Sequence, residues 1–390
     1  MRSALALLTA LAIASPALAL DPPALQLRIA AEPIAALAEH PAACAPEDIP
    51  DAPARAIRLR DGTVQLYASD QINRVNRGPD LLHVQHDCTV VLRGAGSDDP
   101  AAYDDHAWIA TPWIDDDDTI WAIIHDEFHG HTRKSLCPTG RYMDCWFNAL
   151  TLASSTDAGR SFHRAPAAPP GSALVAALPY RYDEVGLGHH GYFNPSNIAR
   201  LDGDLYMFAF ATHANAQREG NCLLRSSRIG RADAWRAWDG AAFSIAFANP
   251  YSGPVQPEQH VCMPVANNSL RWPITALVQH ASTGLFVALM QDTTRHGGIY
   301  YATSPDLLGW SSPERLLPIG GLPEWACGDP EPVAYPSLLD PSSQDRNFQT
   351  VGSTAELFVT RFEHEACRLG RTRTLIRWHV EVSPLRAKQP

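Results

Sequence analysis

The sequence predicts an all-β protein, and within that class a five-bladed β-propeller, from three observations. The first is composition, because 32 Pro, 25 Gly, ten Trp and eleven Tyr are typical of short strands joined by turns. The second is a strand plan that recurs along the chain. The third is that this plan continues across residues 55–390, whereas a single β-sandwich would end after about 100 residues.

Each copy of the plan has an extended apolar run, a turn rich in Asp or Gly, a second run and a more polar strand. Copies surround the turns at residues 115–118, 202–204 and 282–284, another includes Ser337–Leu339 and Glu356–Arg361, and a fainter copy precedes them all. The copies are roughly 65 to 90 residues apart. Because such small sheets bury their faces by packing radially against one another, the repetition favours a propeller over paired sandwiches.

The first residues have the pattern of a secretory signal peptide. Arg2 precedes the apolar run Ala4–Ala14, and small residues follow before a polar, Pro-rich segment. We expect cleavage after Ala19 or Leu20 and export to the periplasm or the medium. No later stretch approaches the length of a membrane span.

The predicted organisation is therefore a signal peptide at residues 1–20, an N-terminal arm at residues 21–54 and a single propeller domain at residues 55–390. The net charge of -11, from 42 acidic residues against 31 Lys and Arg, argues against a nucleic-acid partner.

All eight cysteines follow the predicted signal peptide, and an even number in an exported chain predicts disulfides. Cys137 with Cys145 would close a short loop, and Cys222 with Cys262 a longer one. No C-x-x-C pair occurs, which makes zinc-ribbon and thioredoxin-like sites poor interpretations.

Local motifs connect the repeats to known propellers. Ser155–Phe162 resembles the Asp-box of sialidase-type propellers, in which Asp caps a tight hairpin and Gly supplies a positive φ. Tyr300–Ser311 resembles an outer-strand pattern of five-bladed glycosidases, the arabinanase, β-xylosidase and β-fructosidase group. Asn194–Ile198 and Tyr335–Leu339 are similar to the inner-strand starts of that group, which line its central funnel. The resemblance implies activity on glycans, but three acids at matching positions are not found.

The most unusual stretch is His125–His131, at the end of an apolar strand. Alternate side chains of a strand share one face, so His125, Glu127 and His129 are predicted to project together. A carboxyl group framed by imidazoles is suited to general acid catalysis. The same three residues are also ordinary metal ligands, and they would equally form a hydrogen-bonded cluster without catalysis.

Glycoside hydrolysis needs a second carboxylate, and the candidates are Asp105 and Glu258. Asp105 precedes the inner strand of the same repeat, where a solvated turn is an equal interpretation; Glu258 precedes a later inner strand. The predicted substrate-binding residues are polar side chains near strand ends: His125, His129, His106, Asn194, Asn197, His190 and Arg361.

The leading hypothesis is an exported glycoside hydrolase with Glu127 as general acid and Asp105 or Glu258 as nucleophile or base. Its partner would be an oligo- or polysaccharide, and no cofactor is required. One alternative is a non-catalytic carbohydrate-binding propeller. Another is a metal-dependent hydrolase or lyase with a divalent metal on His125, Glu127 and His129.

Overall fold

The computed structural model describes residues 24–37, 44–46, 48–164, 173–322 and 325–385. The predicted signal peptide lies outside the described residues. The described part of the chain contains strands and short 3-10 helices but no α-helix. None of its helices has both the length and the hydropathy that a membrane crossing requires.

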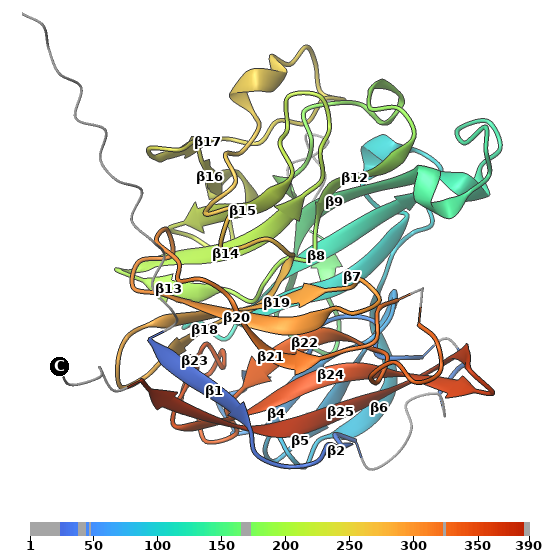
Figure 1. Cartoon of the computed structure of the whole chain (residues 1–390). Coiled ribbons are helices and arrows are strands. Elements are labelled where there is room, and N and C mark those ends of the chain that lie inside the picture. The colour runs from blue at the N-terminus through green and yellow to red at the C-terminus, as the bar shows by residue number, and fades with distance from the viewer. Residues whose placement is uncertain (1–23, 38–43, 47, 165–172, 323–324, 386–390) are drawn as a thin grey trace, which may run out of the picture.

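The strands can be grouped into five mostly antiparallel units in approximate chain order, which confirms the predicted all-β propeller (Figure 1). The first unit contains β3 (Arg55–Arg58), β4 (Val64–Tyr67), β5 (Ile72–Gly78) and β6 (Gln85–Arg93). The second contains β7 (His106–Ile114), β8 (Ile120–His129), β9 (Cys145–Ser155), β10 (His163–Arg164) and β11 (Leu174–Ala176). The third contains β12 (Gly188–Phe193), β13 (Ala199–Leu201), β14 (Asp204–Ala211), β15 (Gly220–Ser226), β16 (Arg236–Trp238) and β17 (Phe243–Ile245).

The fourth unit contains β18 (Ile274–His280), β19 (Phe286–Asp292), β20 (Gly298–Ser304), β21 (Glu314–Pro318) and β23 (Thr350–Val351). The fifth contains β22 (Val333–Leu339), β24 (Thr354–Glu365), β25 (Arg368–Pro384), β1 (Leu25–Ile29) and β2 (Ile34–Ala35). The 3-10 helices are η2 (Pro100–Ala102), η3 (Gly130–Thr132), η4 (Tyr142–Asp144), η5 (Tyr182–Glu184), η6 (Ala232–Ala234) and η7 (Pro257–Gln259).

Hydrogen bonding connects the second and third units into one sheet, because β12 pairs with β14 and also runs parallel to β9. The described strands therefore form four sheets, and the predicted count of five blades stays a prediction. Close approach of β12 to β9 needs Gly191, whose φ is 129°. A Cβ there would lie 2.0 Å from the backbone oxygen of Asn148, so any side chain would force the two strands apart.

Arg55 on β3 holds the centre of the molecule together. Its guanidinium donates to Ser337 Oγ at 3.2 Å, to the Pro195 carbonyl at 3.2 Å and to the Thr275 carbonyl at 2.6 Å. One buried side chain thereby connects the first unit to the third, fourth and fifth. Burial lowers the pKa of Arg55 to about 9, and these acceptors compensate for the lost hydration.

The fifth unit is closed by a strand from the N-terminal arm. β1 is the edge partner of β25, with Leu25 opposite Pro384 and Ile29 opposite Val380, and Figure 1 shows the blue N-terminal strand beside the red C-terminal one. Leu25 and Leu27 are buried in the core of this unit. Residues 25–29 of the predicted arm are therefore part of a sheet.

The Asp-box prediction is confirmed in the β9–β10 turn. Asp157 Oδ1 accepts from the backbone N–H groups of Arg160 and Ser161, both at 3.0 Å. Gly159 has a φ of 74°, and the Phe162 ring packs edge-on against Tyr67. The side chain thus satisfies the backbone donors of the turn.

The eight cysteines form four disulfides, and both predicted pairs are confirmed. Cys137 bonds to Cys145 and Cys222 to Cys262; the remaining two disulfides are Cys44–Cys88 and Cys327–Cys367.

Candidate functional site

A cavity of about 660 Å³ opens where the inner strands of all five units begin. Its polar lining includes Glu127, Asp51, Arg373, Tyr335 and Gln291, and aromatic side chains make up much of the remainder. The second to fifth units each contribute wall residues from their strands, and residues just before β3 and β5 of the first unit complete the wall. A concave site with a few converging polar groups is the usual form of a small-molecule or saccharide site.

The second unit supplies the polar wall of this cavity through strand alternation. His125, Glu127 and His129 project from one face of β8, as predicted, and the intervening Asp126 faces the other way, where it is paired with Arg164 at 2.5 Å. Antiparallel pairing places Asn148 of β9 directly opposite Glu127, and His106 of β7 opposite it on the other side. Because side chains alternate along each strand and directly opposed residues share a face, these polar side chains lie close together.

Glu127 is buried, with its carboxyl group held by neutral partners. Nε2 of His129 lies 2.7 Å from Oε2, and the Tyr142 hydroxyl donates to the same oxygen at 3.3 Å. Burial, and next the negative charge of Asp51, raises the pKa of Glu127 from 4.5 to about 8. Glu127 is therefore protonated at neutral pH, which is the state a general acid requires.

Three imidazoles of the cavity wall are neutral. Burial lowers the pKa of His125 to about 3 and that of His129 to about 4. Burial likewise lowers the pKa of His189 to about 3. Because none of these rings carries a charge at neutral pH, they act as hydrogen-bonding groups and do not neutralise a carboxylate.

Asp51 is a cavity residue that the sequence analysis missed. The Tyr335 hydroxyl donates to Asp51 Oδ1 at 2.9 Å, and Arg373 forms an ion pair with the same oxygen. Burial raises the pKa of Asp51, whereas the Arg373 charge and the Tyr335 hydrogen bond favour its ionised form. A recurring signal could have identified it, because Asp51-Ala52-Pro53 precedes the first inner strand much as Asn194-Pro195 precedes β13.

The predicted second carboxylates lie elsewhere. Asp105 is outside the cavity lining and forms a two-pronged ion pair with Arg133, with both N–O distances 2.8 Å. Burial acts to raise its pKa, but hydrogen bonds from His106, Arg133 and the backbone N–H of His129 outweigh burial and hold the pKa well below its usual range. Glu258 is exposed on η7, away from the cavity.

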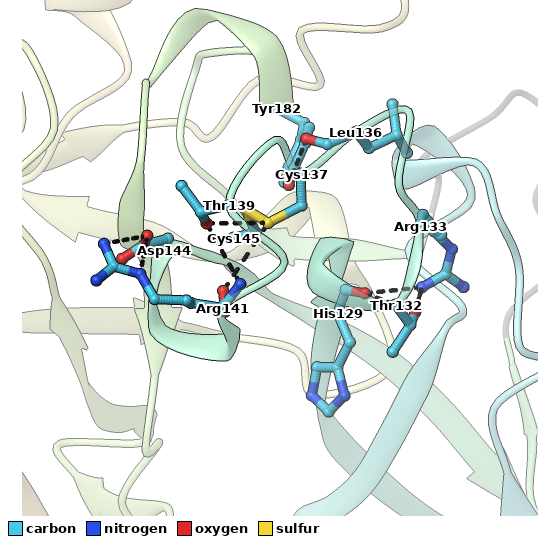
Figure 2. The surroundings of a disulfide bond; sticks show 10 residues. All are labelled: His129, Thr132, Arg133, Leu136, Cys137, Thr139, Arg141, Asp144, Cys145 and Tyr182. Atoms are coloured by element: carbon cyan, nitrogen blue, oxygen red, sulfur yellow. Dashed lines mark hydrogen bonds and ion pairs between the residues drawn. A yellow bond between two sulfur atoms is a disulfide. The ribbon is translucent and has the colours of Figure 1, made fainter.

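Asp105 instead anchors the segment that carries His129. Its Oδ2 accepts the His129 backbone N–H at 2.9 Å, and Arg133 also donates to the His129 carbonyl at 3.0 Å (Figure 2). The fixed backbone orients the His129 ring toward Glu127. Asp105 thus contacts the backbone of His129 and does not line the cavity.

The two predicted asparagines, Asn194 and Asn197, have different surroundings. Asn194 lines the cavity with a φ of 48°, and Tyr335 at the matching place in the fifth unit has a φ of 60°. Both precede proline, and such left-handed backbone in residues other than glycine is costly and typical of functional sites. Asn197 is buried between units, where its amide pairs with the backbone N–H and carbonyl of Leu277.

The remaining predicted binding residues lie beside the cavity or outside it. His106 stacks on His129 with ring centroids 4.0 Å apart, but it does not line the cavity. His190 points to the Leu187 carbonyl, with Nε2 3.3 Å from it, and its neighbour His189 lines the cavity instead. Arg361 pairs with Glu363 at 3.1 Å, outside the cavity.

Stacked rings form one wall. Tyr142 stacks on Trp146 with centroids 4.6 Å apart, Trp146 on His189 at 3.8 Å, and Phe193 follows at 4.5 Å from His189. Flat apolar faces of this kind are suited to sugar rings. Tyr142 sits on η4, in the loop that the Cys137–Cys145 disulfide closes. Figure 2 shows this disulfide.

The three proposed metal ligands do not form a compact donor set. Among the described residues, the group of His, Cys, Asp and Glu whose ligand atoms all lie within 4.8 Å of one another is Cys44, Asp48 and His86. Cys44 is bonded to Cys88, so its sulfur is not a thiolate ligand. His86 and Asp48 instead hydrogen-bond to each other at 2.6 Å.

No family model and no curated relative matches the chain. Solved structures similar to it include a thermostable family-43 glycoside hydrolase, with 13% identity, a TM-score of 0.46, and coverage of 87% of this chain and 95% of that one. The α-L-arabinanase of Cellvibrio cellulosa with arabinohexaose follows at 11% identity and a TM-score of 0.46, covering 84% and 91%. The catalytic domain of the Coprinopsis cinerea GH62 α-L-arabinofuranosidase is 7% identical with a TM-score of 0.45, covering 92% and 98%.

These neighbours belong to the same broad group that the sequence motifs resemble. At such identities and TM-scores, the likeness carries no conclusion about activity.

Proposed function

We propose that this chain is a glycan-active hydrolase that cleaves glycosidic bonds in the central cavity. The observation that supports this proposal is the pair of unlike carboxyl groups on its walls. Glu127, among neutral partners, holds its proton at neutral pH, whereas Asp51 is paired with Arg373. Two carboxyl groups with such different partners, a neutral imidazole for Glu127 and a guanidinium for Asp51, match the acid and base roles of glycoside hydrolysis.

In this mechanism Glu127 protonates the leaving oxygen, assisted by the hydrogen bond with His129. Asp51, which is ion-paired with Arg373 although burial raises its pKa, acts as nucleophile or as the base that activates water. The stacked wall of Tyr142, Trp146 and His189 holds the sugar rings. Asp51 thus replaces Asp105 and Glu258 as the proposed second carboxylate.

Export to an oxidising compartment is part of the proposal. The four disulfides support it, because stable disulfides are characteristic of exported proteins. N-terminal sequencing of the protein recovered outside the cytoplasm tests the cleavage after Ala19 or Leu20. Recovery of the intact N-terminus would contradict it.

The test of activity is hydrolysis of a panel of neutral oligosaccharides and 4-nitrophenyl glycosides, followed by mass spectrometry. We expect cleavage by the wild type and loss of at least about a hundredfold in turnover in Glu127→Gln and Asp51→Asn. Glu258→Gln is the matched control, because this acid is exposed and lies outside the cavity. Equal activity in all four proteins would refute the assignment.

A second candidate is a carbohydrate-binding propeller without catalysis. The engagement of Asp51 by both Arg373 and Tyr335 favours it, since a carboxylate tied in this way attacks less readily. Saccharide binding by calorimetry without any hydrolysis in the panel would select this alternative.

A further inference from the structure

Asn148 connects two histidines of the cavity wall. This side chain on β9 is fully buried, with an exposed fraction of 0%. Its Nδ2 lies 2.5 Å from Nε2 of His125, and its Oδ1 lies 3.1 Å from Nε2 of His189. Both histidines line the cavity, yet they come from different strands, β8 and β12, on either side of β9.

A carboxamide offers a donor at one end and an acceptor at the other. The amide N–H of Asn148 therefore requires a lone pair on Nε2 of His125, which places the His125 proton on Nδ1. The amide oxygen requires a proton on Nε2 of His189, which leaves a lone pair on its Nδ1. The two neutral rings are thus held in opposite tautomers.

The two Nδ1 atoms remain available for a ligand. No described residue forms a hydrogen bond with Nδ1 of either His125 or His189, and neither atom is among the buried unpartnered nitrogens. The His189 ring is also held in its plane by Trp146, which stacks on it with an interplanar angle of 9°. On two residues that line the cavity, the two Nδ1 atoms offer one donor and one acceptor without a partner among the described residues.

We infer that Asn148 is a positioning residue that sets opposite tautomers on His125 and His189, so that this pair binds hydroxyl groups of a neutral sugar. A hydroxyl group both donates and accepts, so adjacent hydroxyls satisfy a donor and an acceptor together. This inference rests on the proposed function for its ligand class, while the tautomers themselves are a property of the free protein.

The experiment is long-range ¹H–¹⁵N correlation NMR of protein labelled at histidine, with ring signals assigned from His125→Gln and His189→Gln. We expect His125 protonated at Nδ1 and His189 at Nε2. In Asn148→Asp, an ionised carboxylate offers only acceptors, so the His125 proton should move to Nε2. The same tautomer on both rings of the wild type, or the reverse assignment, would overturn the inference.

Asn76→Asp is the matched control. Asn76 is likewise buried, and its Oδ1 lies 2.8 Å from Nδ1 of His86, outside the cavity. This variant should leave the His125 and His189 signals unchanged. Should Asn148→Asp fail to fold, Asn148→Ser, which keeps a small hydroxyl, provides the comparison. In this variant the two rings should lose their fixed tautomers and show mixed signals. Retention of the wild-type signals would count against the proposed role of Asn148.

Ligand recognition is measured by titrating the wild type with methyl pentosides and hexosides. We expect both Nδ1 signals to shift with at least one sugar, and the affinity to fall at least about tenfold in the Asn148 variant. Binding that leaves both signals unmoved would refute the hydroxyl-binding role. Because no turnover is needed, a protein that binds but does not hydrolyse refutes the proposed hydrolase activity alone.

Discussion

The imidazole of His129 and the carboxyl group of Glu127 project from the same face of β8, with Nε2 of one 2.7 Å from Oε2 of the other. Neither residue is charged at neutral pH, because burial raises the pKa of Glu127 to about 8 and lowers that of His129 to about 4. The pair therefore shares a hydrogen bond without an ion pair, which keeps the proton on the cavity acid.

Glu127→Gln should change the pH dependence of stability. Since the folded pKa of about 8 lies above the ordinary 4.5, the stability that Glu127 contributes is fully present below about pH 4.5 and is lost as pH rises toward and through 8. The amide does not titrate, so at pH 9 the free energy of unfolding of the variant, relative to that of the wild type, should rise by an amount on the order of a few kcal/mol. Thermal unfolding from pH 5 to 9 measures this, with Glu258→Gln as control; parallel curves for Glu127→Gln and wild type would contradict it.

Asp105→Asn should destabilise the protein in the opposite pH range. The pKa of Asp105 is held below its ordinary 3.8, so its stabilising contribution is present above about pH 4 and disappears as pH falls. We expect a loss of about 2 kcal/mol at pH 7, shrinking on acidification. Urea unfolding measures it, and Asp98→Asn serves as control because Asp98 pairs with the same Arg133 but is 89% exposed. A loss that persists unchanged in acid would rule out the ion pair as its cause.

Arg373→Met should leave the partly buried Asp51 carboxylate, whose side chain is 22% exposed, without its cationic partner. We expect a loss of roughly 1.5–3 kcal/mol in the free energy of unfolding. Much of this should be recovered in the double variant with Asp51→Asn, which removes the unpaired charge. Arg361→Met on β24 is the control, because its half-exposed pair with Glu363 should contribute less than about 1 kcal/mol. Equal losses in both arginine variants would contradict the assignment.

Replacing Cys137 and Cys145 by serine should loosen the loop that carries Tyr142. The eight-residue separation corresponds to about 2–3 kcal/mol of stability in the chain-entropy account. Trypsin should then cut within residues 130–144, which contain Arg133, Lys134 and Arg141.

The paired variant of Cys222 and Cys262, separated by 40 residues, is the control. It should lose more stability, about 4 kcal/mol, while the loop remains resistant to trypsin. Cleavage of the loop in both variants would mean that global unfolding, and not the local disulfide, controls access.

The all-β class, the recurring strand plan, the Asp-box turn and two disulfide pairs could be predicted from the sequence alone. These features depend on local rules, because turns and strands are set by neighbouring residues through backbone preferences and alternation. The same alternation predicted that His125, Glu127 and His129 would share a face, since only residues two apart were involved.

The distant residues that lie near His125, Glu127 and His129 are known only from the tertiary structure. Asp51 reaches the cavity from 76 residues before Glu127 in the numbering, and Arg373 reaches it from β25. Asp105 looked equally suitable in sequence, yet Arg133 occupies its carboxylate. Whether an acid is free, paired or protonated depends on burial and on charges from other units, and radial packing of the units sets both.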